Sequence, residues 1–202
     1  MQSNHMILAS GSPRRAELLG MVGIKFEVYP ANVSEEIDAG VIPADAVREL
    51  AERKARFVAQ QYTDRWVLGA DTVVACDDRI LGKPASQEEA VRMLMSLQGR
   101  VHQVWTGFCV CHFERNVTFS SACETQVHMC ALSPSDIESY VATGEPMDKA
   151  GAYAIQGIGS AFVKAIEGSY TNVVGLPVPE VLDALLRYEA IDSRLVGVAG
   201  GR

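Results

Sequence analysis

The sequence predicts an α/β or α+β domain built around one mixed sheet. Short apolar runs typical of strands alternate along the chain with amphipathic segments typical of helices. At 202 residues the chain suits one domain, and 48% of its residues are hydrophobic, which is enough for a sizeable core. No internal repeat, low-complexity linker or clear domain boundary interrupts this pattern.

In the first half of the chain, helix-start signals separate the apolar runs. Ser12 suits a helix cap and Pro13 the first helical position, so we expect a helix to begin there and to end near Gly20 or Gly23. The elements expected, in order, are a strand at 6–9, a helix at 14–19, a strand at 25–29, an acidic loop at 30–43, a helix at 44–62 and a buried strand at 66–76 that is interrupted at 69–72.

In the second half, two capping signals mark helix starts. Ser86 and Glu89 have capping-box spacing, Ser133 precedes Pro134, and Gly144 is expected to end the second of these helices. The elements expected are a turn at 77–78, a helix from 86 to 97, two long antiparallel strands at 101–113 and 117–132, a helix from 133 to 143, a strand at 161–166 and a helix at 177–188.

The two ends of the chain are set apart from this domain, which we place at 6–190. Residues 1–5 are mostly polar and precede a second methionine, Met6, so we interpret them as the remnant of a tag. Residues 191–202 are rich in glycine and are expected to form a flexible tail.

The composition argues against several classes of protein. A formal net charge of -7 disfavours binding to a nucleic-acid polymer, which needs clustered positive charge, but it permits binding of a small anion. No apolar stretch is long enough to span a bilayer and the start lacks a secretory signal, so we expect a cytoplasmic protein without a membrane partner. The five cysteines are odd in number and lack CxxC spacing, which favours reduced, buried thiols.

The segment SGSPRR at 10–15 is the first candidate site. A helix start carries partial positive charge and unpaired N–H groups, so two arginines in the first turn are unfavourable there by up to about 1 kcal/mol each. A bound phosphate would remove this conflict, because it can accept hydrogen bonds from the N–H groups and from Arg14 and Arg15. An ordinary helix start with solvent-facing arginines is the alternative.

Asp71, in the GADT segment, is the second candidate. An aspartate that ends an apolar strand is costly to bury unless it is paired or binds a metal, and ligands gather at strand ends in α/β folds. Asp71 is therefore a candidate metal ligand or general base, and a hydrogen bond to the next turn is the alternative. Glu35 and Glu36 could complete a site for Mg²⁺ or Mn²⁺, although loop carboxylates are commonly only solvated.

Further candidates lie on basic and polar segments. Lys54, on the long helix, and Lys83, before a proline, could supply cations, although single lysines are usually solvated. The loop 144–151, which leads to Gln156 and Gly157, is polar and rich in glycine, so we expect it to line a binding cleft. No serine–histidine–acid triad is visible, and the histidines in strand-like runs are interpreted as structural: His102, His112 and His128.

Taken together, these segments resemble the Maf family of nucleoside triphosphate pyrophosphatases, once called septum formation inhibitor proteins. The matching stretches run in the family's order from Met6 to about Tyr188, and several are multi-residue matches, so together they are highly specific. They are ILASGSPRRAELL, RKAR, VLGADTVV, ILGKP, GEPMDKAGAYAIQG and NVVGLP.

The resemblance implies a two-lobed α/β fold around a cleft, related in architecture to the inosine triphosphate pyrophosphatases. It also implies a homodimer, a divalent cation (Mg²⁺ or Mn²⁺), and hydrolysis of a nucleoside triphosphate to the monophosphate and pyrophosphate. By the family's motifs Asp71 would be the proton acceptor and, with Glu36, would bind the metal. The residues that would bind the triphosphate are Ser10, Ser12, Arg14, Arg15, Lys54 and Lys83.

The chain is most similar to the branch of the family that acts on dTTP and UTP, through Arg14, Thr72 and Gln156. A glutamine amide can donate one hydrogen bond and accept another, which matches the carbonyl and ring N–H of uracil or thymine. Two alternatives are a phosphatase that removes the terminal phosphate and a nucleotide-binding regulator of cell division with little turnover. Asp71 and the basic residues favour the pyrophosphatase.

Overall fold

A computed structural model of the protein describes residues 6–38, 40–77 and 79–192. Our interpretations of residues 1–5, of residue 78 and of residues 193–202 lie outside this described part. The elements, with η for a short 3₁₀ helix, are β1 (Met6–Leu8), α1 (Pro13–Met21), β2 (Phe26–Val28), α2 (Pro43–Ala59), β3 (Val67–Cys76), β4 (Arg79–Leu81), α3 (Gln87–Leu97), β5 (Val101–His112), β6 (Val117–Met129), α4 (Pro134–Ala142), η1 (Glu145–Asp148), η2 (Ala150–Ala152), η3 (Ile158–Phe162), β7 (Val163–Glu167), α5 (Tyr170–Val174) and α6 (Val178–Arg187).

The strands form one seven-stranded sheet in the order β2-β1-β3-β5-β6-β7, with β4 paired to β3. Strand β1 pairs in parallel with both β2 and β3, and helices α1 and α2 provide the crossover connections that parallel neighbours need. The β3–β4 and β6–β7 pairs are antiparallel, so the sheet is mixed, as predicted. The α/β alternative is therefore confirmed, whereas the arrangement of two lobes around a cleft stays a prediction.

The chain forms two compact units, each with its own apolar core. Of the described residues, the first unit contains those up to Asp71, 106–122 and those from Gly175 onward, and the second contains those in 72–105 and 123–174. Our placement of one domain over 6–190 stays a prediction.

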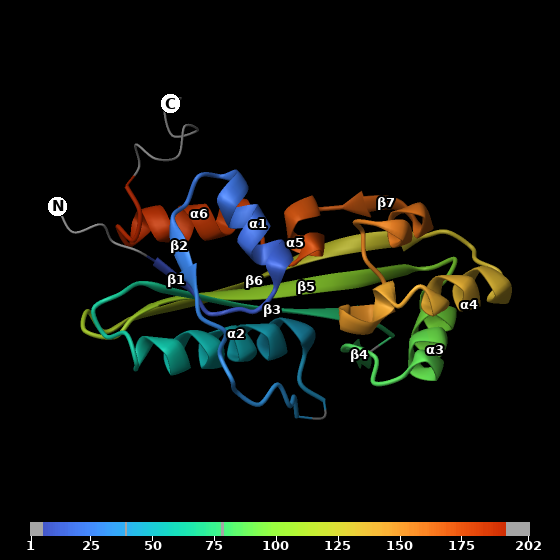
Figure 1. The fold of residues 1–202 in the computed structure, drawn as a ribbon, viewed down its shortest axis with the longest axis horizontal. Helices are drawn as coiled ribbons and strands as arrows, with labels where there is room; N and C mark the ends of the chain where they lie inside the picture. The colour runs from blue at the N-terminus through green and yellow to red at the C-terminus, as the bar shows by residue number, and fades with distance from the viewer. Residues whose placement is uncertain (1–5, 39, 78, 193–202) are drawn as a thin grey trace. The chain divides into compact units, whose positions relative to one another are not determined.

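In the first unit, helix α2 lies on one face of the sheet and helices α1 and α6 lie on the other (Figure 1). Two strand glycines bring the backbone of α2 unusually close to the sheet. A Cβ atom at Gly69 would lie 2.4 Å from the carbonyl oxygen of Ala51, and one at Gly107 would lie 2.2 Å from that of Val47. Any larger residue at either position would push the helix off the sheet.

Strand β3 runs without interruption through the GADT segment, so the predicted break at 69–72 was wrong. Asp71 lies in the middle of this strand and not at its end. Glycine and aspartate disfavour strands by intrinsic propensity, but tertiary packing overrides that preference here. Gly69 is required by the close approach of α2, and Asp71 is stabilised by a charged partner described below.

In the second unit, helices α3 and α4 lie side by side (Figure 1), and both begin at the serines that the sequence indicated. Ser133 caps α4, as predicted, and it forms a capping box that was not predicted there: its hydroxyl accepts a hydrogen bond from the Asp136 N–H, and the Asp136 carboxylate accepts one from the Ser133 N–H. Helix α4 ends at Ala142, and Gly144 follows with a φ of +79°, a conformation that favours glycine.

The cysteines are all free, as predicted. Cys109 and Cys111, two residues apart on strand β5, both pack in the core of the first unit. The prediction of burial was wrong for Cys123 and Cys130, which are half-buried. None of the helices in the described ranges is both long and apolar enough to cross a membrane.

Candidate active site

The centre of the candidate site is a buried ion pair between helix α2 and strand β3. The ammonium of Lys54 donates to Oδ1 of Asp71 at 2.5 Å, and the two residues are only 6% and 8% exposed. The same ammonium donates to Oε1 of Glu35, in the acidic loop, also at 2.5 Å. Lys54 therefore holds two carboxylates, and its loss would leave the buried charge of Asp71 without its ion-pair partner.

The close packing of α2 explains why this lysine reaches the strand. Residues two apart on a strand share a face, so Asp71 faces the helix that Gly69 contacts. A Cβ atom at Gly69 would meet both Ala51 and Ala55, and Lys54 lies beside these alanines on the helix. The pair is thus a direct consequence of the glycine two residues before Asp71.

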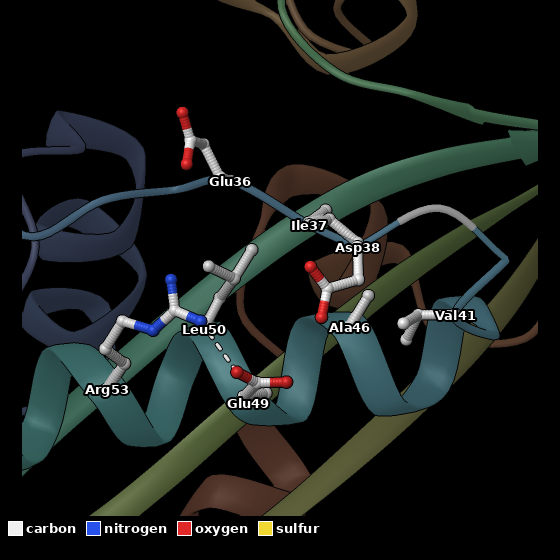
Figure 2. A pocket seen from close by; sticks show the side chains of 8 residues that line it. All are labelled: Glu36, Ile37, Asp38, Val41, Ala46, Glu49, Leu50 and Arg53. Carbon is white, nitrogen blue, oxygen red and sulfur yellow. Dashed lines mark hydrogen bonds and ion pairs between the residues drawn. The ribbon is translucent and has the colours of Figure 1, made fainter.

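Helix α2 also holds the acidic loop through Arg53, whose guanidinium donates to the carbonyl oxygen of Ser34 at 2.7 Å and to Glu49 at 2.6 Å. Glu36 is exposed, and its carboxylate makes no hydrogen bond or ion pair with the described residues. Figure 2 shows the Glu36 side chain pointing away from α2. Glu36 is one of the residues that line a small pocket between the loop and the helix, where Arg53 and Glu49 form an ion pair. The structure thus brings Glu35 to the Lys54–Asp71 pair, and metal binding by Glu36 stays a prediction.

Arg15 is buried beside this ion pair and is held by protein acceptors. Its Nε donates to the carbonyl oxygen of Gly175 at 2.8 Å, and its Nη1 donates to Ser10 Oγ at 3.0 Å and to the carbonyl oxygen of Ala70 at 2.8 Å. Burial lowers the pKa of Arg15, although the charge of Asp71 acts in the opposite direction. Arg15 therefore fixes helix α1 next to strand β3, and its direct contact with a phosphate stays a prediction.

The start of α1 offers hydrogen-bond donors and no acidic residue in its first turn. Ser12 occupies the cap position, as predicted, but its side chain caps no N–H group. Ser10 Oγ accepts hydrogen bonds from the Ser12 N–H at 3.2 Å and from Arg15, so its own hydrogen is left to donate to another acceptor. At Gly11 a Cβ atom would meet only Pro30, at an ordinary 3.7 Å, so packing within this unit does not require glycine there.

The carboxylates of this cluster suit a hard divalent cation. Asp71 and Glu35 both reach one ammonium, and Oδ2 of Asp71 accepts no hydrogen bond from the described residues. Within the described ranges, no group of three or more histidine, cysteine, aspartate or glutamate side chains could hold a metal by itself. Mg²⁺ typically binds one or two carboxylates together with phosphate oxygens and water, and the residues present fit that pattern.

Arg14 is half-buried in the first turn of α1, in the first unit, and the other predicted site residues belong to the second unit. Thr72 is half-buried on strand β3, and Lys83 is exposed after β4 and forms no ion pair with the described residues. Gln156 is half-buried just before η3, and its amide makes no hydrogen bond within the described part of the chain. Their action together with Asp71 stays a prediction.

The histidines make structural contacts, as predicted. His102 is buried with its Nε2 2.7 Å from the hydroxyl of Tyr153, and burial lowers its pKa to about 4. It is therefore neutral at pH 7. The other two contact a ring and a carboxylate: His112 packs edge-on against Trp66, and His128 pairs with Glu167.

Sequence reasoning did not identify Glu145, whose carboxylate accepts hydrogen bonds from the backbone just after Gln156. The available signal was a glutamate directly after Gly144 in the polar loop. Its partners could not be inferred from spacing, because they lie 13 and 14 residues further along the chain.

A mixed α/β sheet that carries a buried lysine–aspartate pair next to the start of an arginine-rich helix defines a protein suited to binding a small polyanion. Comparison of the sequence with known families narrows this class. The chain belongs to the Maf family, because the family profile described as Maf-like protein matches residues 5–188.

Three relatives that match this chain over nearly their whole length have the same name. The dTTP/UTP pyrophosphatase of Geobacter sp. (strain M21) is 49% identical over 200 residues, which cover 99% of this chain and 100% of that protein. The proteins of the same name from Moorella thermoacetica and Bacillus cereus are 49% and 46% identical and cover 89% and 91% of this chain, and 93% and 95% of their own length. Among solved structures, the Ham1 protein of Staphylococcus aureus is 15% identical with a TM-score of 0.49, covering 92% of this chain and 99% of that one.

Proposed function

We propose that this protein hydrolyses dTTP and UTP to the nucleoside monophosphate and pyrophosphate. The observation that carries the proposal is the buried Lys54–Asp71 pair beside the SGSPRR turn, in a chain that is 49% identical over 99% of its length to a protein named dTTP/UTP pyrophosphatase. The pair joins a carboxylate that can accept a proton to a cation that can bind phosphate, in a position largely withdrawn from water.

The triphosphate is proposed to bind at the start of α1. The Ser10 hydroxyl has a hydrogen left to donate, and the first turn adds positive charge without an acidic residue. Glycine at position 11 allows the backbone to approach a ligand closely. The side chains assigned to the phosphates are those of Ser10, Ser12, Arg14, Arg15, Lys54 and Lys83.

Asp71 is proposed as the proton acceptor. A water oxygen attacks the α phosphorus in line, the bond from that phosphorus to the bridging oxygen breaks, and pyrophosphate leaves with the bridging oxygen. The proton of the water passes to Asp71. Lys54 shields the carboxylate before substrate arrives, because it sits between two acids. It can then donate to a phosphate oxygen instead.

A divalent cation, Mg²⁺ or Mn²⁺, is part of the proposal. It would be held by Asp71 and by a carboxylate of the acidic loop, where Glu36 follows from the family motifs and Glu35 already lies at the Lys54 ammonium. When bound, it would neutralise charge on the phosphate oxygens and lower the pKa of water.

The base is proposed to be read by Arg14, Thr72 and Gln156. The Gln156 amide is suited to this, because it makes no hydrogen bond within the described residues and can offer one donor and one acceptor to a uracil or thymine edge. We also propose that the protein works in the cytoplasm as a homodimer.

Product analysis tests the proposal. Incubation with dTTP and Mn²⁺ or Mg²⁺ should release one pyrophosphate per dTMP, and turnover should stop when the metal is chelated. Release of orthophosphate would instead identify a phosphatase. Tight nucleotide binding without turnover would identify a regulator of the kind named above.

A further inference from the structure

The loop that carries Gln156 is fastened at both ends to one glutamate and one tyrosine. The carboxylate of Glu145 accepts hydrogen bonds from the Ile158 N–H at 3.0 Å and from the Gly159 N–H at 2.9 Å. The hydroxyl of Tyr140 donates to the same carboxylate at 2.8 Å and accepts from the Ala154 N–H at 3.3 Å. Gln156 lies between these two attachments.

The backbone of this loop is built around that carboxylate. Gly157 has a φ of +80°, a conformation that side chains rarely adopt, and a Cβ atom there would lie 2.6 Å from Oε2 of Glu145. At Gly159 a Cβ atom would lie 2.5 Å from the carbonyl oxygen of Ala154 and 2.7 Å from the Tyr140 hydroxyl. The loop therefore closes tightly on itself and on Glu145, and glycine is required at both positions.

The charge of Glu145 suits this role. Ile158 and Gly159 are the first residues of η3, so their N–H groups have no partner within that helix and donate to the Glu145 carboxylate instead. Burial raises the pKa of Glu145, but these two N–H groups, the Tyr140 hydroxyl and the charge of Lys149 together outweigh it, so the net effect lowers the pKa. The Glu145 carboxylate is thus the anion that these two N–H groups bind.

Tyr140 and the segment after Gln156 are held from a second direction as well. The ring of Tyr140 is buried and packs edge-on against Phe162, at the end of η3, with centroids 4.8 Å apart. The Gln156 amide, by contrast, has no hydrogen-bond partner among the described residues. The backbone of this loop is therefore held rigidly, whereas the Gln156 side chain makes no hydrogen bond with the described residues.

We infer that Glu145 is a positioning residue for base selection: it fixes the backbone on the far side of Gln156, so that the Gln156 amide meets the pyrimidine edge without first being ordered. This inference rests on the proposed function, because it takes Gln156 as the residue that reads the base. Pre-ordering of a loop raises affinity and selectivity by removing the entropy cost of ordering it on binding.

The test is a double-mutant cycle with Glu145→Gln and Gln156→Ala. In Glu145→Gln an amide NH₂ replaces one acceptor oxygen and so faces a backbone N–H, while size and shape are kept. We expect the ratio of kcat/KM for dTTP to that for dATP to fall about tenfold, through KM, with kcat for dTTP within about twofold. The double variant should be no less selective than Gln156→Ala alone.

Glu138→Gln is the matched control. Glu138 lies on helix α4, as Tyr140 does, is exposed and has no hydrogen bond or ion pair with the described residues, so this variant should keep the wild-type ratio. Amide hydrogen exchange gives a readout that is independent of activity: exchange at Ile158 and Gly159 should be faster in Glu145→Gln and unchanged in Glu138→Gln. If Glu145→Gln does not fold, Tyr140→Phe removes the hydroxyl link to Ala154 and should lower the ratio in the same direction.

Two results would overturn the inference while leaving the proposed function intact. One is a wild-type dTTP-to-dATP ratio in Glu145→Gln where Gln156→Ala has lost it. The other is a double variant in which the two losses simply multiply, because independent residues act additively in free energy. If the wild-type protein releases no pyrophosphate from dTTP, the proposed function fails, and this inference fails with it.

Discussion

The surroundings of Asp71 and of Gln156 differ in how they stabilise charge. Around Asp71, opposite charges are buried together, with Lys54 paired to two carboxylates and Arg15 tied down beside them. Around Gln156, one carboxylate is bound almost entirely by neutral donors, and the amide itself is left unengaged. In the proposed function, the first arrangement binds the triphosphate, which all nucleoside triphosphates share, and the second reads the base, in which they differ.

The largest effect is expected for Asp71→Asn, which keeps the size of the side chain but removes the proton acceptor. We expect kcat to fall by about 10² to 10⁴, the range for loss of a general base, and to fall alike for every nucleotide tested. Pyrophosphate release gives the rate, and circular dichroism shows whether the fold is kept. A loss confined to dTTP would contradict the division of roles between the two regions.

Lys54→Met tests the charge balance of the first region. This change removes the ion-pair partner of the buried Asp71 carboxylate, although the charge of Arg15 still lies nearby, so we expect the free energy of unfolding to fall by about 3 kcal/mol, measured by urea denaturation. Lys83→Met is the matched control, because Lys83 is exposed and forms no ion pair with the described residues. Similar stability losses in the two variants would show that the buried pair is not what stabilises this region.

In the second unit, which contains Gln156, His102 and Tyr153 form a buried, neutral, hydrogen-bonded pair. Its contribution to the free energy of unfolding should therefore depend on pH. Burial lowers the pKa of His102 to about 4, below the value of 6.5 expected in the unfolded chain, so between these values the unfolded state binds more protons. The stabilisation is complete above pH 6.5 and is lost as the pH falls towards 4. The full loss amounts to about 3 kcal/mol.

The difference between the wild type and His102→Gln isolates this contribution from that of other groups. The free energy of unfolding should decline less steeply between pH 6.5 and pH 4 in the variant. Parallel curves for the two proteins over that range would refute the assignment of a neutral, buried His102.

The smallest effect is expected for Gln156→Ala. Loss of one hydrogen-bonding amide should lower kcat/KM for dTTP about tenfold and should change hydrolysis of dATP little. Steady-state kinetics on both nucleotides measures it. An equal fall in kcat/KM for both nucleotides would indicate that Gln156 acts on the triphosphate and not on the base. It would contradict the contrast between the two regions.

Much of the fold could be predicted because its signals are local. The cap of α4 at Ser133, the start of α1 at Pro13 and the two long strands follow from a few adjacent residues. The continuity of β3 could not be predicted, because the reason for Gly69 lies on another element, at Ala51 and Ala55 of α2.

The candidate site divides in the same way. The SGSPRR turn is contiguous, so phosphate binding there could be predicted from the sequence, and it stays a prediction. The partners of Lys54 come from two other segments, and Arg15 donates to Gly175, which follows it by 160 residues. Such pairings depend on tertiary packing, and one of them brings Glu35, the neighbour of the predicted metal ligand Glu36, to the Lys54 ammonium.

The most direct test of the central claim is the position of solvent oxygen in the products of dTTP hydrolysis. With the reaction run in H₂¹⁸O, attack of water on the α phosphorus predicts one ¹⁸O atom in dTMP and none in pyrophosphate, as mass spectrometry can show. Label in pyrophosphate, with unlabelled dTMP, would place the attack on the β phosphorus and contradict the account.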